Sequence, residues 1–221
     1  MENFETLSMD VDEKEHKRNI RAWTMYDWAN SAFATTVMGV VLPTYFATYI
    51  AQGSSVPIWG SAVAIGSLIA ALLSPILGAI ADFKASKKTF MAFFAALGIL
   101  STALLWFVVS PADQTLCIIL YILGTIGFAG SLVFYDSLLP HVAKEDEIDQ
   151  VSSRGYALGY IGGGILLLIN AIMIFLGPRF MTGMPEEEAT ALMMRLSLVS
   201  VAIWWAVFSI PIFRHVHEPA A

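Results

Sequence analysis

Long runs of apolar residues, separated by short polar connectors, dominate the chain. Each run holds about 20 residues, the length that an α-helix needs to cross the hydrocarbon layer of a bilayer. The pattern therefore predicts an all-α integral membrane protein folded as a six-helix bundle. The predicted spans are residues 29–50, 58–81, 89–109, 115–139, 156–176 and 194–213.

The runs divide the chain into three parts. We expect a cytoplasmic tail at residues 1–22, a transmembrane domain at residues 23–213 and the start of a cytoplasmic linker at residues 214–221. Ten of the 12 lysine and arginine residues fall in the tail, in the second and fourth connectors and at the C-terminal end. Because positive residues concentrate on the cytoplasmic side of membrane proteins, both termini are predicted to be cytoplasmic.

Composition supports a lipid environment. The chain is 57% hydrophobic and 14% charged, whereas soluble domains are about half apolar and about a quarter charged. No basic stripe alternates with aromatic residues, so a nucleic-acid partner is not expected. The single cysteine, Cys117, has no partner for a disulfide or a cysteine metal site.

Catalytic chemistry is not predicted. The histidines fall in the tail and connectors, with no Ser/His/Asp or Cys/His grouping, no zinc-protease motif and no phosphate-binding loop. We therefore expect no enzyme activity, no cofactor and no metal. The histidines are His16, His141, His215 and His217.

Polar residues inside the predicted spans are costly in lipid unless they face protein or a water-filled path. They are the candidates for a substrate cavity. Asn170 is the most informative, because its amide must place two donors and a carbonyl; both cavity lining and an interhelical hydrogen bond remain open for it. The candidates are Asn30, Thr35, Thr36, Tyr121, Thr125 and Asn170.

Four ionisable residues lie at the cytoplasmic ends of predicted spans. Our hypothesis is that they form an ion-pair cluster that opens and closes an inner gate; the alternative is independently solvated charges. The residues are Asp27, Asp82, Asp136 and Arg154.

Glycines recur at four-residue intervals in the fifth predicted span. Gly155, Gly159 and Gly163 would lie on one helix face, which is a pattern typical of closely packed membrane helices. Such a face permits either static packing or sliding during a conformational cycle, and both remain open.

Several segments resemble the major facilitator superfamily. Residues 78–82 (GAIAD), followed by three lysines, look like its signature loop. Residues 26–33 (YDWANSAF), 135–140 (YDSLLP) and 155–164 (GYALGYIGGG) resemble its vacuolar-effluxer-like branch, which includes a fungal vacuolar amino-acid exporter linked to autophagy. The signature loop departs from the usual pattern, because Phe83, Ala85 and Ser86 replace its basic residue, glycine and arginine.

The resemblance implies that this chain is the N-terminal half of a twelve-span transporter, built from two inverted three-helix units. Substrate would lie between two such halves, with the first and fourth spans lining the cavity. The fourth span has no arginine, so the proton relay of drug exporters with that feature is not expected.

The sequence thus predicts the N-terminal half of a secondary active transporter that moves a small solute, with amino acids as the candidate substrates, by alternating access. The expected partners are the lipid bilayer, the solute and a C-terminal six-helix half, supplied by the same full-length chain, a separate chain or a second copy. A multi-pass location in a bacterial inner membrane is expected. The alternative is a half-size membrane protein without transport activity, acting as a scaffold or partner subunit.

Overall fold

The computed structural model describes the backbone of residues 2–51, 55–83 and 86–218, and the side chains of residues 12–51, 55–81 and 86–218. Within these ranges, six helices are long and apolar enough to cross a membrane. The predicted six-helix membrane fold is therefore confirmed. The six spans are Asp12–Ile50, Ser55–Ala81, Lys87–Phe107, Pro111–Val142, Ile148–Phe180 and Glu186–His215.

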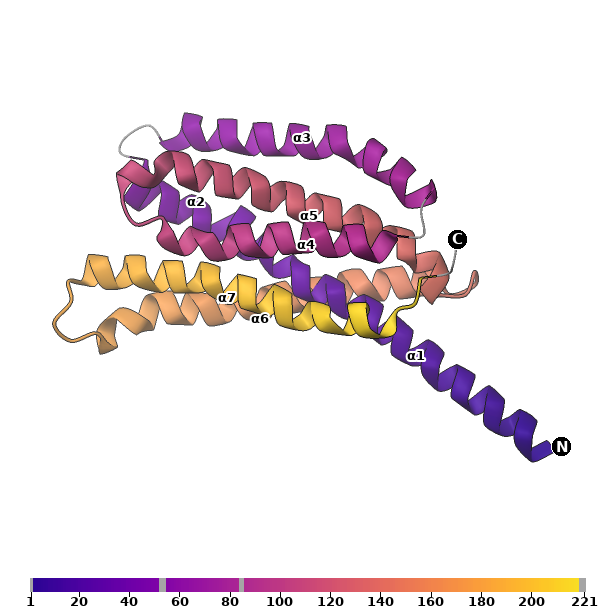
Figure 1. Cartoon of the computed structure of the whole chain (residues 1–221). Coiled ribbons are helices and arrows are strands. Elements are labelled where there is room, and N and C mark those ends of the chain that lie inside the picture. Colours follow the sequence, from indigo (N-terminus) through magenta and orange to yellow (C-terminus); the bar gives the residue numbers. More distant parts are fainter. Residues whose placement is uncertain (1, 52–54, 84–85, 219–221) are drawn as a thin grey trace.

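The first span is a composite of α1, a π-helical segment, the short helix α2 and a second π-helical segment. The other spans are built on α3, α4, α5, α6 and α7, in chain order (Figure 1). The elements of the first span are α1 (Glu2–Ala32), Phe33–Val40, α2 (Val41–Tyr45) and Phe46–Ile50. The others are α3 (Ser55–Phe83), α4 (Lys87–Leu104), α5 (Gln114–Val142), α6 (Ile148–Leu176) and α7 (Glu186–His215).

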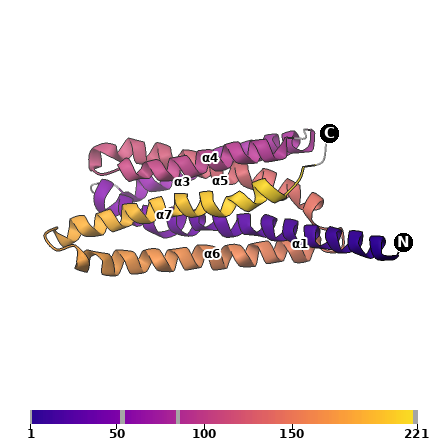
Figure 2. The same cartoon turned by 60° about the horizontal axis from the view of Figure 1, so that its bottom comes forward.

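The helix contacts are symmetric between the first three spans and the last three. The first helix, α1, packs chiefly on α6 and α7, and its counterpart α5 packs chiefly on α3 and α4 (Figures 1 and 2). If the first three spans are matched in order with the last three, the α1–α6 contact corresponds to the α3–α5 contact, and the α1–α7 contact to the α4–α5 contact. The α4–α7 contact corresponds to itself. Since three spans cross the membrane an odd number of times, the second unit has inverted topology, as the sequence predicted.

A wide helical turn interrupts the first span just after α1. Residues Phe33–Val40 are π-helical, and Val40 departs from helical geometry with φ −130° and ψ −65°. Pro43 lacks an N–H group, so it cannot continue the regular ladder of hydrogen bonds. Thr44 Oγ1 donates to the Val40 carbonyl at 2.7 Å. π-helical turns are rare and are found frequently at functional sites.

Glycines allow a close backbone approach between α4 and α5. A Cβ atom added to Gly127 would lie 2.4 Å from the Gly98 nitrogen and 2.7 Å from the Phe94 carbonyl oxygen. Gly98 in turn meets the Trp205 ring of α7, which a Cβ would approach to 2.4 Å. The absence of side chains at Gly98 and Gly127 therefore brings α4, α5 and α7 together.

The N-terminal turns of α1, which fall in the predicted tail, project from the bundle (Figure 1). Lys17 pairs with Glu13 one turn earlier on the same helix. His16 Nε2 lies 2.7 Å from Glu147 Oε2, between α5 and α6. The His16 contact thus joins the start of the first span to the connector between the fourth and fifth.

Replacing Glu147 with glutamine is expected to loosen the helix around His16. The hydrogen bond from His16 lowers the pKa of Glu147 below its ordinary value of 4.5. This contact therefore stabilises the fold above that ordinary pKa and is lost as the pH falls through the lowered one. Amide hydrogen exchange across residues 12–20 at neutral pH should accelerate by a factor of about two to five.

The matched control for this measurement is Glu145→Gln, which removes an exposed acid from the same connector. Equal exchange in the Glu145 and Glu147 variants would contradict the tether. Exchange in the unsubstituted chain should approach that of the Glu147 variant once the pH is below the lowered pKa, after correction for the intrinsic pH dependence of exchange.

Candidate functional site

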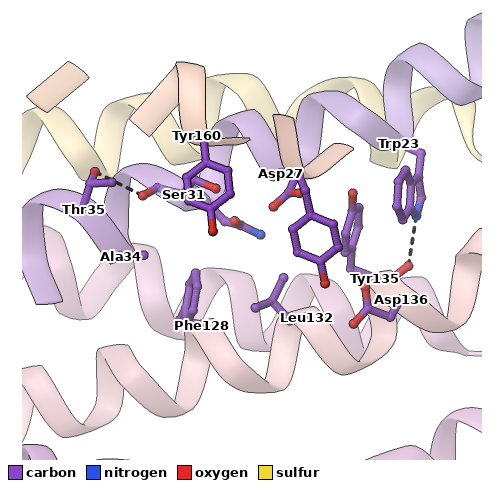
Figure 3. Close-up of a pocket in the computed structure, with 12 residues that line it drawn as sticks. Trp23, Asp27, Ser31, Ala34, Thr35, Phe128, Leu132, Tyr135, Asp136 and Tyr160 are labelled. Atoms are coloured by element: carbon purple, nitrogen blue, oxygen red, sulfur yellow. Dashed lines mark hydrogen bonds between the residues drawn. The ribbon is translucent and has the colours of Figure 1, made fainter. Parts of the chain in front are cut away.

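A cavity of about 250 Å³ lies between the first, fourth and fifth membrane-crossing helices (Figure 3). Polar, acidic and aromatic side chains line it together. The first span contributes Trp23, Asp27, Asn30, Ser31, Ala34 and Thr35. The other two helices contribute Phe128, Leu132, Tyr135 and Asp136 from α5, and Tyr156 and Tyr160 from α6.

The lining follows a four-residue interval on each helix. It includes positions 23, 27, 31 and 35 of the first span, positions 128, 132 and 136 of α5, and positions 156 and 160 of α6. Residues four apart share one face of an α-helix. Three helix faces therefore meet at this cavity. The end of the cavity near Thr35 lies at the π-helical segment that begins at Phe33.

Glycines of α6 let α1 pack closely against this helix beside the cavity. A Cβ atom on Gly159 would lie 2.6 Å from Ser31 Oγ and 3.1 Å from the Asp27 carboxyl carbon. On Gly163 it would lie 2.9 Å from the Ser31 carbonyl oxygen. One turn before Gly159, the added atom on Gly155 would lie 2.9 Å from the Trp23 ring. Close approach of α1 and α6 thus depends on these positions having no side chain.

Two carboxylates share the cavity. Asp27 is 8% exposed, whereas Asp136 is exposed at the rim (Figure 3). Neither carboxylate forms an ion pair within the part of the chain that the structure describes. Lysine and arginine are both missing from the described lining. The cavity is therefore an acidic compartment without an internal counter-charge.

An aromatic pair fixes one wall. Trp23 stacks on Tyr135 with ring centroids 4.2 Å apart, and Trp23 Nε1 donates to the Tyr135 carbonyl oxygen at 3.0 Å (Figure 3). Two polar atoms of the lining are buried without a hydrogen-bond partner, namely Tyr135 Oη and Asn30 Nδ2. Buried polar atoms are normally paired, so these two are exceptions in the wall of the cavity.

Only some of the predicted cavity residues line the cavity in the structure. Asn30 and Thr35 line the cavity, and Thr35 Oγ1 donates to the Gly163 carbonyl at 3.2 Å. Thr36 is fully buried and is not part of the lining. Asn170 instead accepts a hydrogen bond from Ser200 of α7 at 3.0 Å. Of the two alternatives for Asn170, the structure therefore shows the interhelical hydrogen bond.

The predicted cavity residues of the fourth span face another helix. The Tyr121 ring lies 4.6 Å from the Trp59 ring of α3. Thr125 Oγ1 donates to the Tyr121 carbonyl at 2.9 Å, and a Cβ on Gly66 of α3 would lie 3.6 Å from Thr125. Tyr121 and Thr125 thus belong to the contact between α3 and α5 rather than to the described cavity lining.

The four predicted gate residues occupy different places. Asp27 and Asp136 share the cavity, whereas exposed Arg154 lines a separate hollow with Glu147. Among the described side chains, no ion pair joins Arg154 to Asp27 or Asp136. Asp82 lies in the last turn of α3, and its side chain is outside the described residues. The two aspartates are therefore the part of the predicted cluster that this structure brings together.

The aromatic residues of the site were not predicted, because only polar residues within the spans were taken as cavity candidates. Trp23, Tyr135, Tyr156 and Tyr160 all line the cavity. Tyr135 has no four-residue spacing to the others, but the spacing of Trp23 from Asp27 and of Tyr156 from Tyr160 was a signal in the sequence. Its meaning depended on knowing which helices pack together.

The sequence profile described as "Vacuole effluxer Atg22 like" matches residues 53–150 and 141–220, which together cover most of the chain. The chain belongs to the Atg22-like family. The predicted resemblance is thereby confirmed, and the cavity is a feature of an Atg22-like chain. No solved structure matches it.

Two curated relatives agree with this family. The chain is 37% identical to the uncharacterized MFS-type transporter YxiO of Bacillus subtilis (strain 168) over 211 residues, covering 93% of this chain and 48% of YxiO. It is 25% identical to Autophagy-related protein 22 of Coccidioides immitis (strain RS) over 199 residues, covering 66% of this chain and 31% of that protein. This Atg22-like chain therefore spans half or less of the relatives that it matches.

Proposed function

We propose that this chain is the N-terminal six-helix half of a secondary active transporter, which moves a small solute across the membrane by alternating access. The observation that carries the proposal is the acidic and aromatic cavity between the first, fourth and fifth spans. A polar cavity at a helix interface is costly in a membrane unless it serves a solute or water pathway. Similarity to an MFS-type transporter supports the same function.

A second six-helix half would complete the cavity. Tyr156 and Tyr160 line it, yet they are 61% and 78% exposed. Exposed tyrosines beside buried Asp27 indicate a site with one open wall. A C-terminal half from the same full-length chain, a separate chain or a second copy would close this wall and hold solute between the halves.

Amino acids are the first solutes to test, because the family profile describes vacuole effluxers and the sequence resembles a branch that includes an amino-acid exporter. The positive residues support a multi-pass orientation with both termini cytoplasmic. The similarity to a Bacillus protein supports a bacterial cytoplasmic membrane, which is the inner membrane where a bacterium has two. In this arrangement Asp27 and Asp136 belong to the cytoplasmic part of the pathway.

The test uses liposomes loaded with a mixture of amino acids and other small metabolites. They carry either this chain alone or this chain together with the half of YxiO that the alignment leaves uncovered. Mass spectrometry of the external medium should detect efflux of at least one solute above protein-free liposomes, and Leu replacement of Gly159 should abolish it by filling the space beside Asp27.

The opposite result is a pair that assembles, as shown by co-purification, but releases no solute. This outcome would favour the alternative of a scaffold or partner subunit without transport activity. The matched control is Gly164→Leu on the same helix, since a Cβ at Gly164 meets no atom within 4 Å. Equal efflux from the Gly159 and Gly164 variants would show that transport does not depend on this cavity.

A further inference from the structure

The charged side chains of the described cavity lining are all acidic. This bears on the chemical class of the solute, which the proposed function does not specify. Two carboxylates line it, with no lysine or arginine in the described lining. Five aromatic residues surround the carboxylates: Trp23, Phe128, Tyr135, Tyr156 and Tyr160. Carboxylates attract cations, and aromatic faces attract them through the ring quadrupole. Both chemistries of this wall favour the same kind of ligand.

The buried carboxylate of Asp27 gives a second indication of a ligand. Asp27 is 8% exposed and has no ion-pair partner among the described residues. A buried charge is costly unless it is paired. A bound cation would provide the pairing that the chain itself does not provide.

We propose that this half of the transporter binds the positively charged nitrogen group of an organic solute, an inference that rests on the proposed function. Asp27 pairs with the ammonium group in the interior, and Asp136 attracts it at the rim. The exposed rings of Tyr156 and Tyr160, which line the same cavity, face the nitrogen substituents. Because the described lining has no cationic side chain, a carboxylate on the same solute finds no counter-charge within this half.

An inorganic metal ion fits the cavity less well. Metal ions that prefer oxygen take six or more ligands in the case of calcium and keep an octahedral shell in the case of magnesium. The described residues contain no group of three or more His, Cys, Asp or Glu side chains able to hold a metal. Aromatic rings make up much of this lining and offer no ligand atoms for such ions, whereas they suit alkylated ammonium groups.

The test compares three probes of similar size on the purified chain by isothermal titration calorimetry. Choline carries a quaternary ammonium, 3,3-dimethyl-1-butanol is its neutral isostere, and glycine betaine adds a carboxylate to the same ammonium head. Choline is expected to bind, with both other probes at least about tenfold weaker, since the Coulombic attraction to Asp27 and Asp136 and the cation–π contacts both require a net positive charge. Equal affinity for choline and its neutral isostere, or no binding of choline, would overturn the proposal.

Variants of the two acids locate the binding. Asp27→Asn should weaken choline binding by about 10- to 100-fold, and Asp136→Asn by a smaller factor because its carboxylate is exposed. Asp149→Asn is the matched control, since it removes an exposed acid of α6 outside the cavity lining. If Asp27→Asn does not fold, Asp136→Asn alone carries the test. Choline affinity that is unchanged in Asp136→Asn would then contradict the assignment.

Failure of this inference differs from failure of the proposed function. Efflux of a neutral or anionic solute that choline does not inhibit would leave transport standing and overturn cation recognition. Choline binding that is lost in Asp27→Asn, without efflux of any solute from the reconstituted pair, would leave the cation site standing and overturn transport. The two experiments therefore report on separate claims about one cavity.

Discussion

Gly127→Ala is expected to lower the apparent melting temperature of the detergent-solubilised chain by about 2–12 °C. The added methyl group would lie 2.4 Å from the Gly98 nitrogen, a backbone atom that cannot rotate away. Overpacking of a close contact typically costs about 1–3 kcal/mol, and each kcal/mol shifts the melting temperature of a chain of this size by about 2–4 °C. Thermal unfolding followed by intrinsic fluorescence measures the shift.

Gly78→Ala is the control for this prediction. Gly78 is also helical and within a predicted span, but a Cβ atom there meets nothing within 4 Å. The control should melt at the temperature of the unsubstituted chain or up to about 4 °C above it, since alanine is favoured over glycine in helices by no more than about 1 kcal/mol. Equal melting of the two alanine variants would show that α4 and α5 do not approach as closely as described.

The second large effect is expected at the contact between α1 and α6. A methyl group on Gly162 would lie 2.6 Å from the Trp28 ring and 2.8 Å from the Trp28 carbonyl oxygen. The same carbonyl accepts a hydrogen bond from Trp204 Nε1 of α7 at 3.2 Å. Gly162→Ala should therefore separate α1 from α6 and disturb α7 as well. We expect a destabilisation of about 1–3 kcal/mol and weaker choline binding.

Gly164→Ala tests this contact with the same chemical change two residues further along α6. Its added methyl group meets no atom within 4 Å. Melting temperature and choline affinity should both stay close to those of the unsubstituted chain. If Gly162→Ala keeps the affinity of Gly164→Ala, the walls of the cavity do not depend on this helix contact.

The six helices could be predicted from the sequence because lipid imposes a simple length rule on apolar runs. The glycine interval at positions 155, 159 and 163 was equally readable, since four residues bring side chains back to one helix face. The π-helical turn at Phe33–Val40 was not predicted. Its carbonyl and amide pairing differs by one residue from that of an α-helix, and apolar content does not record such a shift.

The cavity was predictable only in part. Polarity identified Asn30 and Thr35, which line it, but also Tyr121 and Thr125, which face α3. Threonine can satisfy its hydroxyl on its own helix, as Thr125 does with the Tyr121 carbonyl. Polarity within a span therefore does not reveal which neighbour a side chain faces. That information comes from helix pairing, and it is the pairing of α1 with α5 and α6 that assembles the aspartates and aromatic residues.

The position of α3 at the edge of the bundle bears on how the chain is assembled during synthesis. Its span is the least buried of the six, and its principal contact is with α5. Ribosomes make the chain from its N-terminal end, so α3 enters the bilayer before the helix on which it packs has been translated. Membrane helices are stable individually in lipid and associate afterwards. Until α4 and α5 have been made, α3 is thus held by lipid and by the contact of its Trp59 with Phe46 of the first span, and the order of insertion differs from the order of packing.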